Sequence, residues 1–170
     1  LCTLTVFAYG SCANTLTSRL IGAGLQDEVP STLRRILIIS MATLIPILII
    51  FSIFPEQIAS IYTDDKLLAA HSVPALFVVY ISSIMMAVAM IYFEFVSGTG
   101  RTTFALLIET GVLFFYMAYI FLVTEVFRFS IQFVWTADWV YSFLLMAGSV
   151  AFLKWYPWKY KKPENPDIKS

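Results

Sequence analysis

Two glutamates lie inside long apolar stretches of the sequence, where charged side chains are rare. Glu109 is the deepest acid in the chain: at about 1.5 Å per residue, it lies about 10 Å beyond Thr102 in a helix. Glu94 lies nearer to the end of the preceding apolar stretch. An ionised carboxylate in apolar surroundings costs free energy unless it is paired, so such residues are usually retained for a function. Both are therefore candidate sites for a cation or a substrate.

A structural role is the alternative for each glutamate. Glu94 lies about two helical turns before Arg101, so the two side chains could form an ion pair that anchors a helical hairpin. For Glu109 the sequence favours neither role.

A set of polar residues near the start of the chain shares one helical face. Ser11, Asn14, Thr15 and Ser18 follow the i, i+3, i+4 spacing of such a face. The face either hydrogen-bonds to a neighbouring helix or lines an aqueous cavity, and both alternatives remain open. Asn14 joins the candidate site residues for this reason.

Residues typical of other chemistry are missing from the sequence. His71 is the single histidine, and Cys2 and Cys12 would lie about 15 Å apart along one helix, too far for a disulfide. The sequence contains no metal-ligand spacing, nucleophile elbow or phosphate-binding loop. We predict no enzymatic activity, no metal site and no bound cofactor.

The composition indicates which elements position these residues. Hydrophobic residues make up 59% of the 170 residues and charged residues 13%, which leaves too few polar side chains to cover a water-soluble surface. The expected partner is a lipid bilayer, which a helix crosses with about 20 apolar residues. Nucleic-acid binding is not expected, because the net charge is +0.

The apolar runs predict an all-α fold, a polytopic bundle of five membrane-crossing helices within residues 1–156. Two short segments are expected to lie at the membrane interface, and a loose tail is expected at the end of the chain. The crossings are predicted at 1–21, 33–54, 74–96, 103–124 and 136–154, the interfacial segments at 55–65 and 125–135, and the tail at 157–170.

Basic residues predict the orientation, because they accumulate on the cytoplasmic side of a membrane. Alternating the loops places nine Lys and Arg residues on one side and two on the other, so the C-terminal tail is expected in the cytoplasm. The nine are Arg19, Arg34, Arg35, Arg101, Lys154, Lys159, Lys161, Lys162 and Lys169, and the two are Lys66 and Arg128.

Four sequence motifs in this order resemble the multidrug and toxic compound extrusion (MATE) transporters. They are TSRLIGAG at 17–24, FSIFPEQIASIYTD at 51–64, VSGTGRT at 96–102 running into LLIE at 106–109, and WTADWVY at 135–141.

The resemblance implies a fragment holding about the eighth to twelfth helices of a twelve-helix protein with two lobes. The missing N-terminal lobe would then be a partner of this chain. The resemblance also implies that Gly22, Gly24, Gly98 and Gly100 form structural turns, since glycine adopts conformations closed to other residues.

The activity that the resemblance implies is secondary active antiport in the bacterial cytoplasmic membrane. Members export amphipathic, often cationic drugs in exchange for H⁺ or Na⁺, so the coupling ion replaces a cofactor. Some members carry an acid midway along their tenth helix, and the matching residues 83–87 here, SIMMA, carry no charge. Glu109 matches the family's acid after the glycine motif.

Two alternatives differ in function. The related flippases for lipid-linked oligosaccharides share the fold but have a large basic cavity, whereas the predicted crossings hold no buried Arg or Lys. A structural or accessory membrane subunit would use its polar residues only for helix packing.

Overall fold

The computed structural model describes residues 2–55, 66–126 and 136–155, and these residues are almost entirely helical. The predicted all-α fold class is confirmed. The α-helices are α1 (Cys2–Gly22), α2 (Val29–Ile53), α4 (Lys66–Gly98), α5 (Thr102–Phe121) and α7 (Ala137–Trp155), with a 3₁₀ turn η1 (Gln26–Glu28) before α2 and a π-helical turn η2 (Leu122–Val126) after α5.

Three helical segments are long and apolar enough to cross a membrane: Gln26–Ile53, Phe77–Gly98 and Thr102–Glu125. They coincide with three of the five predicted crossings. Helices α1 and α7 are long enough but do not belong to this set of the most apolar helices. The count of five stays a prediction. Most of the predicted interfacial segments and the whole tail lie outside the described residues.

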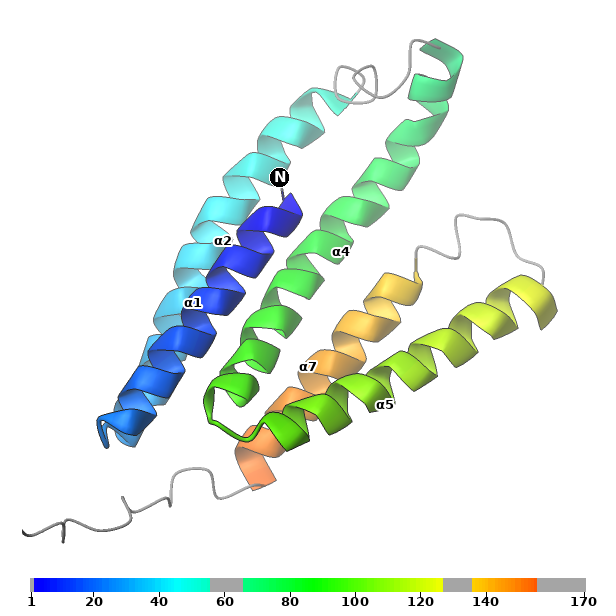
Figure 1. Cartoon of the computed structure of the whole chain (residues 1–170). Helices are drawn as coiled ribbons and strands as arrows, with labels where there is room; N and C mark the ends of the chain where they lie inside the picture. Colours follow the sequence, from blue (N-terminus) through cyan, green and yellow to red (C-terminus); the bar gives the residue numbers. More distant parts are fainter. Residues whose placement is uncertain (1, 56–65, 127–135, 156–170) are drawn as a thin grey trace, which may run out of the picture.

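Helix α4 lies at the centre of the arrangement. It packs against α1, α2 and α7, and more sparsely against α5, which packs mainly on α7. Figure 1 shows α1, α2 and α4 running side by side, whereas α5 meets α4 only near the turn that joins them and then diverges. Helix α7 lies between α4 and α5 and packs against both (Figure 1).

Buried apolar side chains fill two clusters around α4. The larger cluster includes Ile91 and Phe95 of α4 with Leu145 of α7, and the smaller one joins Val6 of α1 to Leu44 of α2. Large apolar side chains on the outside remain exposed, and α5 carries many of them. Such a surface suits contact with lipid rather than water. The most exposed on α5 are Leu106, Leu107, Phe114, Phe115, Met117 and Phe121.

Small residues let α1 and α4 approach closely. A Cβ atom added at Gly98 would lie 2.7 Å from the backbone oxygen of Asn14, and one at Gly10 would lie 3.1 Å from Cγ of Glu94. Ala13 and Thr17 are buried on the same side of α1. Small residues at the contact are typical of helices that pack inside membranes.

The four glycines of the turn motifs have different structural roles. Gly24 and Gly100 have positive φ angles of 75° and 77°, the left-handed conformation that favours glycine. The N–H groups of Gly24 and Leu25 donate to carbonyl oxygens of the last turn of α1, which forms a Schellman cap. Gly22 and Gly98 have no positive φ, contrary to the expected unusual conformation at all four glycines. Gly98 is instead required by the contact with α1.

Candidate functional site

Glu94 and Asn14 meet at the contact between α1 and α4. The Asn14 amide Nδ2 donates a hydrogen bond of 2.8 Å to Oε2 of Glu94. One turn further along α1, the Ser18 hydroxyl donates to the backbone oxygen of Gly98 at 3.0 Å. These two polar side chains of α1 therefore join neighbouring helices, one of the two alternatives left open for this face.

The other half of that polar face points away from α4. Ser11 and Thr15 are exposed, and the Thr15 hydroxyl donates to the Ser11 carbonyl oxygen of its own helix at 2.9 Å. The four residues predicted to share one face therefore have different surroundings: Asn14 and Ser18 contact α4, whereas Ser11 and Thr15 are exposed. Successive residues of a helix are rotated by about 100°, so side chains at i, i+3 and i+4 do not point in the same direction. Part of this face can therefore contact α4 while the rest is exposed.

Glu109 lies apart from the pair formed by Glu94 and Asn14. It is half-buried on α5 beside a cavity of about 420 Å³ near the turn between α4 and α5. The other lining residues are Phe93, Ser97, Thr102, Thr103, Ala105 and Leu106. The structure therefore places the three candidate residues at two locations.

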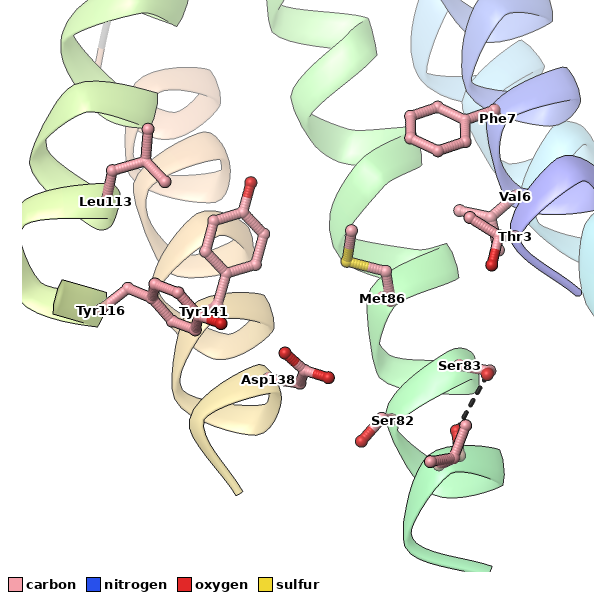
Figure 2. A pocket seen from close by; sticks show the side chains of 11 residues that line it. Thr3, Val6, Phe7, Ser82, Ser83, Met86, Leu113, Tyr116, Asp138 and Tyr141 are labelled. Carbon is pink, nitrogen blue, oxygen red and sulfur yellow. Dashed lines mark hydrogen bonds between the residues drawn. The ribbon is translucent and has the colours of Figure 1, made fainter. Parts of the chain in front are cut away.

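A second cavity, of about 470 Å³, lies where α1 and α4 face α5 and α7. We call it the central cavity (Figure 2). Its wall is mostly apolar, with hydroxyl groups from α1 and α4 and a single carboxylate. Its lining residues are Thr3, Val6, Phe7, Val79, Ser82, Ser83, Met86, Leu113, Tyr116, Asp138 and Tyr141.

Asp138 supplies that carboxylate from the first turn of α7. Free backbone N–H groups at a helix N-terminus stabilise a negative charge there. Asp138 lies in the motif at 135–141 and near the start of the crossing predicted at 136–154, and it was not among the predicted site residues. The available signal was its spacing: Asp138 and Tyr141 lie three residues apart and share a helical face.

Hydrogen bonds hold the start of α7 against its neighbours. The indole N–H of Trp139 donates to the Ser82 hydroxyl of α4 at 2.7 Å. The hydroxyl groups of Tyr119 and Thr136 lie 2.8 Å apart and connect α5 to the residue before α7. Ala137 is buried beside them. The residues on both sides of Asp138 are therefore anchored, which fixes its position at the cavity wall.

Two tyrosines form the side of the central cavity next to Asp138. The rings of Tyr116 and Tyr141 pack edge to face, with centroids 5.7 Å apart and planes at 75°. Figure 2 shows the Tyr116 hydroxyl pointing toward Asp138. An apolar wall, aromatic faces and one carboxylate together suit an organic cation, which carries both a charge and apolar surface.

The region that matches the family's acidic position lies on the opposite wall of this cavity. Ser83 and Met86 belong to the uncharged run 83–87 of α4, and both line the central cavity. Asp138 therefore brings a carboxylate to the same cavity from a different helix. Among the described residues, no group of three His, Cys, Asp or Glu side chains could hold a metal ion.

Comparison with known proteins identifies a family. The model of the MatE family matches residues 1–122, which is more than half of the chain and includes the described parts of α1, α2, α4 and α5. Neither the comparison with curated proteins nor the comparison with solved structures finds a match. The match agrees with the apolar helices and with the motif resemblance: the chain belongs to the MatE family of multi-pass membrane transporters.

Proposed function

We propose that the protein is a secondary active antiporter that exports amphipathic, cationic compounds in exchange for H⁺ or Na⁺. The observation that carries the proposal is the central cavity, in which Asp138 lies next to Tyr116 and Tyr141 in a mostly apolar wall (Figure 2). Its volume of about 470 Å³ lies within the usual range for small-molecule sites. Membership of a transporter family supports the same function.

Exchange follows from the charge of the site. An organic cation or Na⁺ pairs with the ionised carboxylate of Asp138, whereas a proton bonds to it and makes it neutral, so the substrate and the coupling ion compete for the same group. When one leaves, the other can bind, and each ligand favours its own conformation of the transporter. The lack of charge at 83–87 of α4 supports this role for Asp138, because the central cavity has no other carboxylate among its described lining residues.

The proposal also includes the membrane in which the chain lies, its orientation and its contact with the rest of the transporter. The protein lies in a bacterial cytoplasmic membrane with its C-terminus in the cytoplasm, as the basic residues indicate. The exposed Ser11 and Thr15 of α1 contact the N-terminal lobe of the transporter, since polar groups in a membrane need partners.

The cavity linings disfavour the oligosaccharide flippase. Neither cavity has a Lys or Arg among its described lining residues. An anionic lipid headgroup would need such residues, because its charge is costly to bury without a counter-ion. The organic cation therefore fits the structure better.

Replacing Asp138 tests the proposal. In vesicles containing the full-length protein, we expect the wild type to expel a fluorescent cationic dye when a proton or sodium gradient is imposed. We expect Asp138→Asn to bind the dye about 10-fold to 100-fold more weakly, because the amide loses the charge-assisted interaction.

Glu125→Gln is the matched control, because Glu125 is an exposed acid that lines neither cavity. It should behave like the wild type. Dye retention that ignores both gradients in the wild type, at verified expression, would refute the proposed antiport.

A further inference from the structure

Helix α2 exposes one side along its length. Its other side packs against α1 and α4 through buried residues such as Leu33, Leu44 and Leu48. In Figure 1, α2 lies at the edge of the arrangement, on the opposite side of α4 from α5. The exposed residues follow the three- and four-residue spacing of a single helical face. From Arg34 onward they are Arg34, Arg35, Ile38, Ile39, Ala42, Ile45, Pro46, Ile49, Ile50 and Ile53.

The apolar part of this side is as long as one leaflet of a membrane. Ile38, Ile39, Ile49 and Ile50 are each more than half exposed. The distance along the helix from Ile38 to Ile49 is about 16 Å, at about 1.5 Å per residue. The hydrocarbon core of a bilayer is about 30 Å thick, so one leaflet contributes about 15 Å. The row of side chains therefore has the length that one acyl chain needs.

Arg34 and Arg35 lie at the end of this row where α2 begins. Each lies one helical turn before an exposed isoleucine, Arg34 before Ile38 and Arg35 before Ile39. Residues 36–53 carry no charge, so the two arginines lie at the border of the apolar segment. Helical side chains point back toward the N-terminus of their helix. This direction lets both guanidinium groups reach the headgroup region while their stems stay beside the apolar row.

The surroundings of the two arginines leave their charges available. The nearest acids in the sequence are Asp27 and Glu28, which are exposed on η1. Glu28 lies about 10 Å before Arg35 along the helix axis. Within the part of the chain that the structure describes, neither guanidinium group forms an ion pair. Both groups can therefore pair with an anion from outside the chain.

We propose that the exposed side of α2 binds an anionic phospholipid. Its phosphate pairs with Arg34 and Arg35, and one acyl chain lies along the row from Ile38 to Ile49. Arginine suits this partner because its planar guanidinium group can donate two parallel hydrogen bonds to phosphate oxygens. The proposal requires the membrane location of the MatE family but not the proposed antiport.

The isoleucine row favours a lipid over a soluble anion. Inorganic phosphate would contact only the two arginines, and exposed ion pairs of this kind are weak in water. A phospholipid also covers the apolar side chains beyond them. The charge of the arginines favours an anionic headgroup such as phosphatidylglycerol, because basic residues at a membrane surface are attracted to anionic lipids. The choline group of phosphatidylcholine cancels the charge of its phosphate.

Titration of the full-length protein in detergent with fluorescently labelled phosphatidylglycerol tests the proposal. We expect the double variant Arg34→Gln, Arg35→Gln to bind this lipid about 30-fold more weakly, or about 5-fold for each arginine. Labelled phosphatidylcholine should bind the wild type about as weakly. The double variant Arg34→Lys, Arg35→Lys keeps both charges, so it should lose much less affinity than the glutamine pair.

Arg19→Gln is the matched control for Arg34→Gln. Arg19 is an exposed arginine in the last turn of α1, and the exposed residue one turn before it is Thr15 rather than an isoleucine. The control should bind phosphatidylglycerol as the wild type does. Equal losses in Arg19→Gln and Arg34→Gln would overturn the proposal, since any positive charge would then serve.

Three other results would also overturn the proposal. The first is equal binding of phosphatidylglycerol and phosphatidylcholine by the wild type. The second is displacement of the labelled lipid by inorganic phosphate, because the arginines would then hold a soluble anion. The third is a lysine pair that binds as weakly as the glutamine pair, which would mean that charge does not hold the lipid.

Discussion

Two regions of the molecule each hold an acid, but the packing around the acids differs. At the contact of α1 with α4, Glu94 accepts a hydrogen bond from Asn14 between the close approaches at Gly10 and Gly98. At the central cavity, Asp138 faces open space from the first turn of α7. Packing therefore decides the role of each acid in this fold. Glu94 joins two helices, whereas Asp138 is accessible to a ligand in the cavity.

Disrupting the close contact of α1 with α4 should have the largest effect on stability. Gly98→Ala places a Cβ atom 2.7 Å from the backbone oxygen of Asn14, and neither backbone can move without separating α1 from α4. We expect the free energy of unfolding to fall by about 3 kcal/mol, the upper part of the range for overpacking. Thermal unfolding of the full-length protein in detergent measures it.

Gly111→Ala is the matched control, because nothing lies within 4 Å of a Cβ atom added there. Alanine is the better helix former, so this variant should be as stable as the wild type or slightly more stable. Equal losses in the two variants would show that the contact of α1 with α4 is not what requires Gly98.

Removing the amide of Asn14 should have an intermediate effect. Asn14→Ala leaves the half-buried Glu94 without the donor at 2.8 Å, and a hydrogen bond to a charged group is worth about 1.5–3 kcal/mol. The unfolding midpoint should fall, whereas dye affinity should stay at the wild-type value because neither residue lines the central cavity. Ser11→Ala on the exposed part of α1 is the control. A large loss of dye affinity in Asn14→Ala would contradict the separation of the two regions.

The smallest effect on stability is expected from Trp139→Phe, which removes the hydrogen bond to Ser82 and keeps an aromatic ring. The lost bond is worth about 1 kcal/mol. Because this bond anchors the residue next to Asp138, dye affinity should fall as well, by less than in Asp138→Asn. Binding titrations of both variants test the order, and Trp155→Phe, which changes an exposed ring, is the control. Unchanged affinity would mean that Trp139 does not position Asp138.

Hydropathy and turn chemistry predicted the helices well because they depend on neighbouring residues. The predicted crossing at 103–124 and helix α5 with its continuation nearly coincide. The crossing at 33–54 begins later than α2, because Pro30 suits the first helical turn and lets the helix start at Val29. The crossing at 74–96 lies within α4, which extends back to Lys66.

The central cavity could not be predicted in the same way. Asp138 and Ser82 are brought to one cavity by packing between helices that are more than fifty residues apart in the chain. Hydropathy gives the position of a residue along a helix but not the neighbour that it faces. Asp138 also lies at the end of an apolar run, where an acid is ordinary, whereas the depth of Glu109 drew attention to it.

The turn between α4 and α5 has a mechanical consequence. Helix α5 has 20 residues, so it extends about 30 Å from the turn at Gly100. Helix α5 meets α4 only near this turn and packs mainly on α7, so a rotation of α5 about Gly100 would disrupt its contacts with α7, such as the edge-to-face pair of Tyr116 and Tyr141. A rotation of about 10° there would move the far end of a helix that long by about 5 Å. Such a rotation would move the α5 side of the central cavity, formed by Leu113 and Tyr116, once the contacts between α5 and α7 are broken.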